Sequence, residues 1–119
     1  MRILTVSNNV NLLSDLNERL SELWPGADII KEVDPLMAGK YAFHNAVDAV
    51  FAEVNMKRMT GLQLIRFIRR EHTGTLTYLV GRAEEIRDSL TMTAPEEVTG
   101  VITYPFTEDS FAKDLQLCV

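Results

Sequence analysis

Short apolar runs alternate with amphipathic stretches from one end of the chain to the other, and this alternation predicts a repeating order of strands and helices. The apolar runs that predict strands are residues 2–6, 27–33, 48–54, 75–80 and 100–104. The amphipathic stretches that predict helices are residues 11–24, 35–45, 61–72, 84–94 and 108–117. Strand–helix units joined by short links are typical of right-handed crossovers onto one parallel sheet.

Local signals sharpen several of these elements. Leucines in the first amphipathic stretch recur at spacings of three and four and so share one helical face: Leu13, Leu16, Leu20 and Leu23. Asp34 stands before Pro35 as an N-cap stands before a proline at the first helical position, and Thr107 precedes an acidic first turn. The largely continuous apolar character of residues 48–54 indicates a strand covered on both faces, as in a parallel sheet.

Length and composition narrow the class of protein. The 119 residues suffice for one domain with a core and are too few for two, so we expect residues 1–119 to form a single domain. The net charge of −5 argues against a nucleic-acid partner, and the basic cluster of Arg66, Arg69 and Arg70 fits a solvated helix face. A lone cysteine, Cys118, and the lack of a long apolar run favour a cytoplasmic protein without membrane contact.

Several residues that could carry chemistry stand where the predicted strands end. Ser7 and Asn8 follow the first strand, and the third strand ends on Glu53. The fourth strand ends at Val80 and the fifth at Tyr104. In open α/β sheets, sites form at the carboxyl ends of the strands. These five residues are therefore candidates for one shared site.

Three stretches resemble the receiver domain of response regulators, the CheY-like family: ILTVSNN, VFAEVNMKRMTGLQLI and TGVITYPFTEDSF. The resemblance extends over essentially the whole chain. It implies an α/β fold, a doubly wound (βα)5 domain of the flavodoxin/CheY type. This is a three-layer sandwich around a five-stranded parallel sheet of strand order 2-1-3-4-5. The resemblance also implies a cis peptide bond between Tyr104 and Pro105.

The residues at the family's functional positions depart from the family pattern. The acidic pair after the first strand falls on Ser7 and Asn8, and the phosphoryl-accepting aspartate falls on Glu53. The serine or threonine after the fourth strand falls on Val80, and the lysine before Pro-Phe falls on Tyr104. Every one of these matched positions has therefore changed.

The replacements remove the groups that phosphoryl transfer needs. Mg²⁺ prefers carboxylate oxygens, but Ser7 and Asn8 offer neutral oxygens only, which leaves Glu53 as the single carboxylate of the matched positions. Val80 cannot hydrogen-bond a phosphoryl oxygen, and Tyr104 lacks the positive charge of a lysine. The sequence therefore predicts a degenerate receiver, or pseudo-receiver, that has no bound metal and no cofactor and is not phosphorylated.

Three roles remain open for Glu53: a mimic of a phosphorylated aspartate, part of an altered ligand site, or a structural carboxylate. We favour the structural role. In that role we expect Glu53 to be solvated, paired with Lys57, Arg58 or Arg82, or hydrogen-bonded by Tyr104. A surface pair of this kind contributes only about 0–1 kcal/mol.

Two rival functions remain open, a receiver that is phosphorylated after all and a domain that senses a small ligand at the strand ends. Asn8 and Asn9 could bind such a polar ligand, but asparagine is a preferred N-cap and we expect both to cap the first helix. An enzyme is a weaker hypothesis, because no nucleophile–base pair is visible in the sequence.

The function that the resemblance implies is regulation through protein contact. We expect a protein partner, an output domain or a second copy to dock on the surface of the fourth helix, fifth strand and fifth helix. Val101 stands at the family's aromatic switch position on this strand. The candidate residues of this face are Arg87, Glu97, Val101, Thr103, Asp109 and Lys113. The chain is expected to be free-standing or the front half of a longer regulator.

Overall fold

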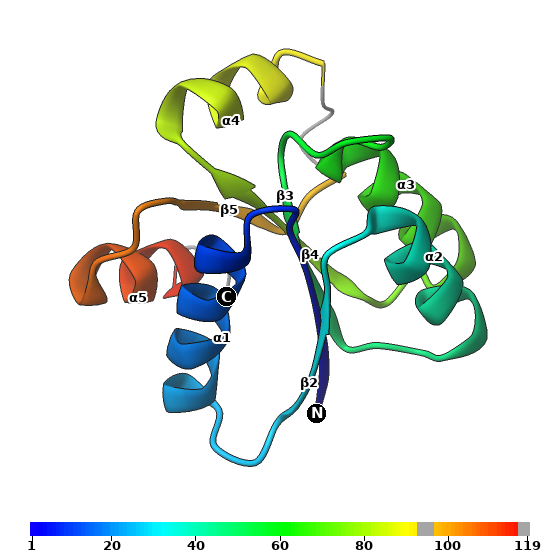
Figure 1. Cartoon of the computed structure of the whole chain (residues 1–119), viewed down its shortest axis with the longest axis horizontal. Coiled ribbons are helices and arrows are strands. Elements are labelled where there is room, and N and C mark those ends of the chain that lie inside the picture. The colour runs from blue at the N-terminus through cyan, green and yellow to red at the C-terminus, as the bar shows by residue number, and fades with distance from the viewer. Residues whose placement is uncertain (93–96, 117–119) are drawn as a thin grey trace.

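The structure, a computed structural model, describes residues 1–92 and 97–116 apart from the side chains of 108, 109 and 116, and strands and helices alternate in it (Figure 1). The strands are β1 (Arg2–Val6), β2 (Asp28–Glu32), β3 (Ala49–Glu53), β4 (Leu76–Gly81) and β5 (Gly100–Thr103). The helices are α1 (Val10–Leu23), α2 (Pro35–His44), α3 (Gly61–Glu71), α4 (Ala83–Leu90) and α5 (Glu108–Gln116). The strands form one parallel sheet in the order β2-β1-β3-β4-β5, which confirms the predicted fold class.

Helices cover both faces of the sheet and divide the core into two layers. In Figure 1, α1 and α5 lie on one side of the sheet, and α2 and α3 lie on the other. The first core layer contains side chains of α1 and α5, such as Leu16 and Phe111, together with Phe51 of β3. The second contains side chains of α2, α3 and α4, among them Ile65 and Ile86. This arrangement is the three-layer sandwich that the sequence predicts.

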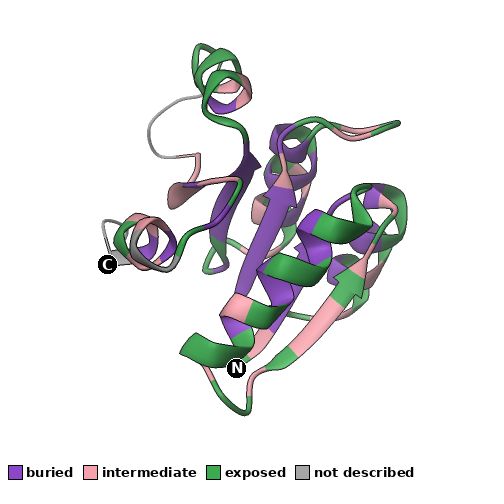
Figure 2. Cartoon of the chain, turned by 60° about the vertical axis from the view of Figure 1, so that its left-hand side comes forward, coloured by how far each residue is buried: buried purple, intermediate pink, exposed green. Residues whose placement is uncertain are grey.

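The central strands are buried along nearly their whole length because helices cover both of their faces. Val50, Phe51 and Ala52 of β3 are fully enclosed, whereas β2 at the edge keeps exposed and half-exposed side chains, green and pink in Figure 2. The ring of Phe51 stacks on that of Tyr78, with centroids 4.5 Å apart. Burial of a side chain such as Phe51 stabilises a fold by about 1.5–3 kcal/mol. The buried centre of the sheet therefore fixes the strand ends at which the candidate site lies.

Side-chain caps begin the helices where the sequence predicts them. Asp34 caps α2 with a proline at the first helical position, and Oγ1 of Thr107 accepts the backbone N–H of Ser110 in the first turn of α5. Thr60 and Gln63 form a reciprocal capping box at the start of α3. Each such cap contributes about 1 kcal/mol to helix stability.

Two details of the predicted helices are wrong. Leu23 is exposed, because the buried face of α1 passes from Leu20 to the half-buried Trp24 and leaves Leu23 outside it. Helix α4 ends at Leu90 rather than at residue 94, since the N–H of Met92 closes a tight turn onto the carbonyl three residues earlier. Residues 93 and 94 lie outside the described part of the chain.

Helix α2 turns its small residues toward the core. Ala38, Gly39 and Ala42 are buried. A Cβ atom placed on Gly39 would lie 3.6 Å from Leu64 and from Phe67 of α3, so the two helices approach closely at this point. The large apolar side chains on its outer side are those of Leu36, Met37 and Phe43.

The helices of the described residues are short. The 14 residues of α1 are fewer than the roughly 20 apolar residues that a bilayer span requires. In residues 1–92 and 97–116 we find no helix that combines the length and the apolar character needed to cross a membrane.

Candidate functional site

Ser7 and Glu53 meet at the ends of two neighbouring strands. β1 and β3 pair in parallel, and Val6 lies opposite Ala52, so the residue after Val6 comes beside the end of β3. Ser7 is fully buried, and its Oγ donates a hydrogen bond of 2.8 Å to Oε1 of Glu53. The same Oγ accepts the backbone N–H of Asn9 at 2.9 Å. This hydroxyl thus joins the carboxylate to the loop that begins α1.

The surroundings of Glu53 raise the pKa of its carboxyl above the ordinary value of 4.5. Burial is the largest cause, and the negative charge of Glu85 acts in the same direction. Hydrogen bonds from Ser7 and from the backbone amides of Asn8 and Asn9 favour the charged form and offset part of the shift in pKa. The Glu53 carboxylate therefore accepts several hydrogen bonds but is partly desolvated.

The partners expected for Glu53 were wrong. The buried hydroxyl of Ser7 is its side-chain partner instead of the exposed Lys57, Arg58 or Arg82, and Tyr104 is not among the donors to its carboxylate. Arg58 itself pairs with Asp34 at 3.5 Å. The reason is geometric: Ser7 projects from the end of the neighbouring strand, whereas the cations stand on the loops beyond the strand ends.

Asn8 and Asn9 have different roles, although both were expected to cap the first helix. Oδ1 of Asn9 accepts the backbone N–H of Leu12 at 3.2 Å and so caps α1. Asn8 donates from Nδ2 to the carbonyl of Val33 at 2.6 Å, and its Oδ1 accepts the backbone N–H of Lys57. Only one residue can occupy the N-cap position, and Asn8 instead ties together the loops that follow β1, β2 and β3.

The ends of β4 and β5 contribute apolar and aromatic groups. Val80 is fully buried and lies opposite Glu53 in the register of β3 and β4. Tyr104 is half-buried, and its ring packs edge-on against Phe106 with the centroids 5.1 Å apart. The Tyr104–Pro105 peptide bond is cis, which confirms the expectation from the sequence.

Gly61, at the start of α3, lies against the backbone of the site. A Cβ atom at this position would overlap the carbonyl oxygen of Glu53 and would stand 3.0 Å from its carbonyl carbon. The N–H of Gly61 donates to the carbonyl of Val54 at 3.0 Å, so the helix cannot easily move away. The sequence holds a signal for this contact, because glycine is otherwise a poor residue within a helix.

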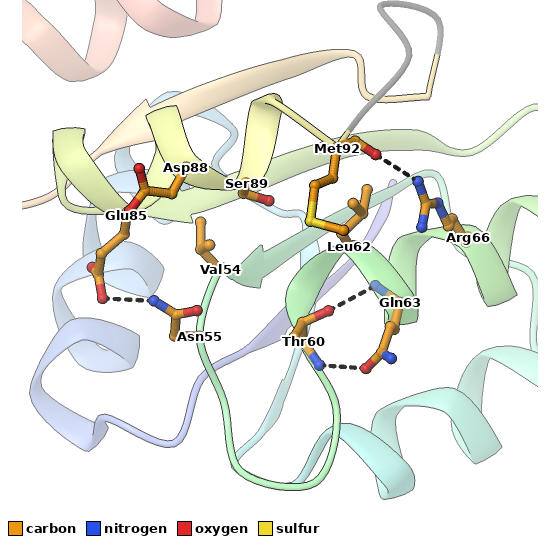
Figure 3. Close-up of a pocket in the computed structure, with 10 residues that line it drawn as sticks. All are labelled: Val54, Asn55, Thr60, Leu62, Gln63, Arg66, Glu85, Asp88, Ser89 and Met92. Atoms are coloured by element: carbon orange, nitrogen blue, oxygen red, sulfur yellow. Dashed lines mark hydrogen bonds between the residues drawn. The ribbon is translucent and has the colours of Figure 1, made fainter.

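A cleft of about 400 Å³ lies next to the strand ends, between the start of α3 and α4 (Figure 3). At one end, Nδ2 of Asn55 donates to Oε2 of Glu85 at 2.9 Å. At the other end, Arg66 donates to the carbonyl of Met92 at 2.9 Å and is ion-paired with Glu97. These contacts connect α3 and the loop before it to α4 and the segment before β5. The pair of Asn55 and Glu85 was not predicted from the sequence, because neither residue stands at a strand end.

Residues expected on exposed surfaces differ in their contacts. Arg66 lies on an exposed helix face, as expected, and also pairs with Glu97. Glu97, a candidate of the docking face, is the partner of Arg66 in this ion pair. Val101, expected on the same face, is half-buried and packs against the core layer of α2, α3 and α4.

The remaining candidates of the docking face differ in exposure. Arg87 and Lys113 are exposed. Thr103 is half-buried, and its backbone N–H donates to Asp114 at 3.1 Å. The side chain of Asp109 lies outside the described residues. Of the candidates whose side chains the structure describes, Arg87 and Lys113 are therefore the exposed ones.

The strand ends do not fit a divalent metal ion. The Ser7 hydroxyl directs its proton at Glu53, and the backbone N–H groups of Asn8 and Asn9 are also directed at that carboxylate. Mg²⁺ needs oxygen lone pairs, mostly from carboxylates, in place of such donors. In the described part of the chain, no group of three or more His, Cys, Asp or Glu side chains is placed to hold a metal. The donors at the strand ends instead hold the carboxylate of the chain's own Glu53 by hydrogen bonds.

Comparison with known sequences gives limited matches. No family profile matches the chain. A stretch of 70 residues, 59% of the chain, is 34% identical to Stress response regulator protein 1 of Lodderomyces elongisporus. An equally long stretch is 30% identical to the protein of the same name from Candida tropicalis. The matched part is only 19% of the first relative and 26% of the second, so the chain spans a minor part of either.

Solved structures match the whole chain. CheY4, a chemotaxis response regulator of Vibrio cholerae, superposes with a TM-score of 0.78 at 20% identity, over 99% of this chain and 98% of that one. The response regulator TrrA of Thermotoga maritima, in complex with Mg²⁺ and BeF, gives 0.80 at 22% identity, over 99% and 98%. A sensor-kinase receiver domain of Pseudomonas aeruginosa, with magnesium in its active-site cleft, gives 0.78 at 18%, over 98% and 94%. The fold is that of a CheY-like receiver domain.

Within this receiver fold, the stability of the chain should depend on pH through Glu53 in a definite direction. The folded pKa is raised above 4.5, so the stability that Glu53 contributes is full below that pH and is lost as the pH rises through the folded pKa. Glu53→Gln removes this loss. Urea unfolding at several pH values should therefore show the variant gaining stability relative to the wild type from acidic to neutral pH.

Glu85 provides the matched control for this titration. Hydrogen bonds from Asn55 and from the backbone N–H of Arg82 lower the pKa of Glu85, so its contribution is present above the ordinary pKa and is lost as the pH falls. Glu85→Gln should lose stability relative to the wild type from acidic to neutral pH. Shifts of the same sign in both variants would contradict the assigned environments.

Proposed function

We propose that this chain is a receiver-like signalling domain that regulates through protein contact and takes up no phosphoryl group. The observation that carries the proposal is the hydrogen bond from the buried Ser7 to Glu53. This bond engages the carboxylate at the strand end with a donor of the chain itself. The receiver fold and the stress response regulators among the relatives support a role in signal transduction. Intact-mass spectrometry after incubation with a phosphodonor and Mg²⁺ tests the proposal: an unmodified chain supports it, and a stable phosphoryl addition contradicts it.

Magnesium should not bind at the strand ends. Two of the similar receiver structures hold magnesium, but here Glu53 is the single carboxylate of the matched positions and its neighbours are hydrogen-bond donors. Calorimetric titration with Mg²⁺ should show no saturable binding in the micromolar range, because one carboxylate with neutral oxygens supplies too little charge for the ion. The Pseudomonas receiver domain is the positive control. Micromolar binding that disappears in Glu53→Gln would contradict this prediction.

A role of Glu53 as a permanent mimic of phosphorylation has less support. Such a mimic would act through a hydroxyl group after the fourth strand and an aromatic switch residue on the fifth. The matched positions hold Val80 and Val101 instead. Val80 is fully buried and Val101 packs against the core, so neither presents a polar group to the carboxylate. We therefore assign Glu53 a structural role, and we propose that the domain is not an enzyme.

We propose that α4, β5 and α5 form the face that contacts a partner protein, an output domain or a second copy. Its exposed cations are Arg87 of α4 and Lys113 of α5, and α4 also carries exposed acidic residues such as Glu84 and Asp88, so the face presents charges of both signs. Charge of this kind steers association and selects among partners more than it adds affinity. Sedimentation velocity over a range of concentrations separates a second copy from other partners: a dimer that dissociates in Arg87→Glu/Lys113→Glu supports self-association through this face.

A further inference from the structure

Helix α2 exposes three large apolar side chains and buries its small ones, while Tyr41 is half-buried against the core. Leu36, Met37 and Phe43 keep 45%, 49% and 54% of their surface in contact with solvent. A helix on the surface of a globular protein normally turns such side chains toward the core and its polar residues outward. Single exposed apolar residues are ordinary, but several gathered on one face mark an interaction site.

These residues form one stripe, which we call the α2 stripe: Leu36, Met37, Lys40, Phe43 and His44. At about 100° per residue, all five fall within roughly a third of the helix circumference. The stripe is continuous along the helix, from its first turn to its last. Helix α2 contains no Asp or Glu, so the polar members of the stripe are Lys40 and His44.

An aromatic and cationic row extends the α2 stripe onto α3. The ring of Phe43 contacts His44 edge-on at 5.2 Å and stacks on Phe67 at 6.5 Å between centroids. The guanidinium of Arg70 lies 5.9 Å from the centre of the Phe67 ring and is itself exposed. The surface therefore combines apolar area with the positive charges of Lys40 and Arg70.

We propose that the α2 stripe, with Phe67 and Arg70, docks an acidic amphipathic segment of a partner protein. Apolar side chains of such a segment would cover Met37 and Phe43, and its carboxylates would meet Lys40 and Arg70. Charge complementarity selects this occupant, since the charges beside the apolar side chains are those of Lys40 and Arg70, on a chain whose net charge is −5. The inference goes beyond the proposed function and does not depend on whether Glu53 accepts a phosphoryl group.

Two other occupants fit the charges less well. A two-fold contact between copies of the chain brings the same patch against itself, so Lys40 and Arg70 would face like charges. An anionic membrane attracts clusters of four to eight basic residues, whereas this patch offers two fixed cations and the rest of the chain is acidic. Both remain outcomes that the experiment distinguishes.

The probe is a phage-displayed library of random peptides, each about 12 residues long so that it can form about three helical turns. The library is selected on the immobilised wild-type chain and counter-selected on Met37→Ser/Phe43→Ser. We expect enrichment of peptides that place Asp or Glu between apolar residues at helical spacing. An enriched peptide is then synthesised with a fluorescent label and titrated by anisotropy.

Variants with opposite expectations make the titration decisive. The Met37→Ser/Phe43→Ser variant should bind the peptide at least about thirtyfold more weakly, as expected for loss of two central apolar anchors. Lys40→Glu/Arg70→Glu should weaken binding about tenfold and reduce its dependence on salt. Leu23→Ser replaces an equally exposed apolar residue of α1 and should leave binding unchanged. Thermal unfolding establishes that each variant is folded.

Several results would overturn the proposal. These are no enrichment on the wild-type chain, enriched peptides that are basic, and peptides that bind the serine double variant as tightly as the wild type. A wild-type dimer that becomes monomeric in the serine double variant would assign the stripe to a second copy. Flotation with vesicles of phosphatidylserine and phosphatidylcholine that depends on Phe43 would assign it to a membrane.

Discussion

The Glu53→Asp variant, incubated with acetyl phosphate and Mg²⁺, should show no phosphoryl addition by intact-mass spectrometry. The substitution shortens the side chain to the length of the usual acceptor. It does not restore the carboxylates that hold the metal, the lysine that neutralises the transferred group or the hydroxyl that hydrogen-bonds to it. Groups that act together on one developing charge contribute in a strongly non-additive way. Repair of one position alone should therefore leave the reaction undetectable.

Combined repair should restore labelling. We expect measurable phosphoryl addition in Ser7→Asp/Asn8→Asp/Glu53→Asp, and a further increase of about 100-fold or less when Tyr104→Lys is added, the size typical of one electrostatic group in a transition state. Circular dichroism must first show that the triple variant folds, because Ser7 is fully buried. Ready labelling of Glu53→Asp alone would mean that another carboxylate completes a metal site. Glu85, whose charge already acts on Glu53, is the first candidate.

Gly61→Ala should destabilise the fold by about 3 kcal/mol or more, at the upper end of the cost of overpacking. The added methyl group would overlap the carbonyl oxygen of Glu53, which is a backbone atom held in the sheet and cannot rotate away as a side chain could. The hydrogen bond from Gly61 to Val54 also holds the start of α3 in place. Urea unfolding followed by circular dichroism measures the change.

Gly39→Ala is the matched control for this clash. Its added methyl group would stand 3.6 Å from Leu64 and from Phe67, an ordinary van der Waals separation. Alanine is favoured over glycine within a helix by about 0.5–1 kcal/mol, so this variant should be as stable as the wild type or more stable. A Gly61→Ala variant that unfolds at the same urea concentration as Gly39→Ala would contradict the close approach at Glu53.

The order of elements was accessible from sequence because several independent signals agree. Continuous apolar strands such as residues 49–53 imply cover on both faces, and caps such as Asp34 and Thr107 mark where helices begin. The residues that would gather at the strand ends were also predictable, since parallel strands place their carboxyl ends at one edge of the sheet. Ser7 and Glu53 meet there, with Val80 opposite Glu53.

The hydrogen-bond partners at those strand ends were not predictable. Asn8 and Asn9 have the same side-chain chemistry, and only the backbone path decides that Asn9 caps α1 while Asn8 reaches the loops of the two neighbouring strands. Cationic residues such as Lys57 and Arg58 follow Glu53 closely in the sequence. The side chain that donates to Glu53 is nevertheless Ser7, at the end of the adjacent strand. The contacts of Arg66 with Glu97 and Met92 likewise join segments whose distance in space the sequence pattern does not encode.

Helix α2 places the side chains that pack in the core and those that face the solvent on different sides of the helix. Ala38 and Ala42 are almost completely enclosed, so a larger side chain at either position would have to displace the core around it. Outer residues such as Met37 and Phe43 carry few such constraints, and substitutions at surface positions usually change stability by no more than about 0.5 kcal/mol. Across an evolving lineage, the recognition surface can therefore diversify quickly while the scaffold beneath it is conserved, and a new partner can be acquired without a new fold.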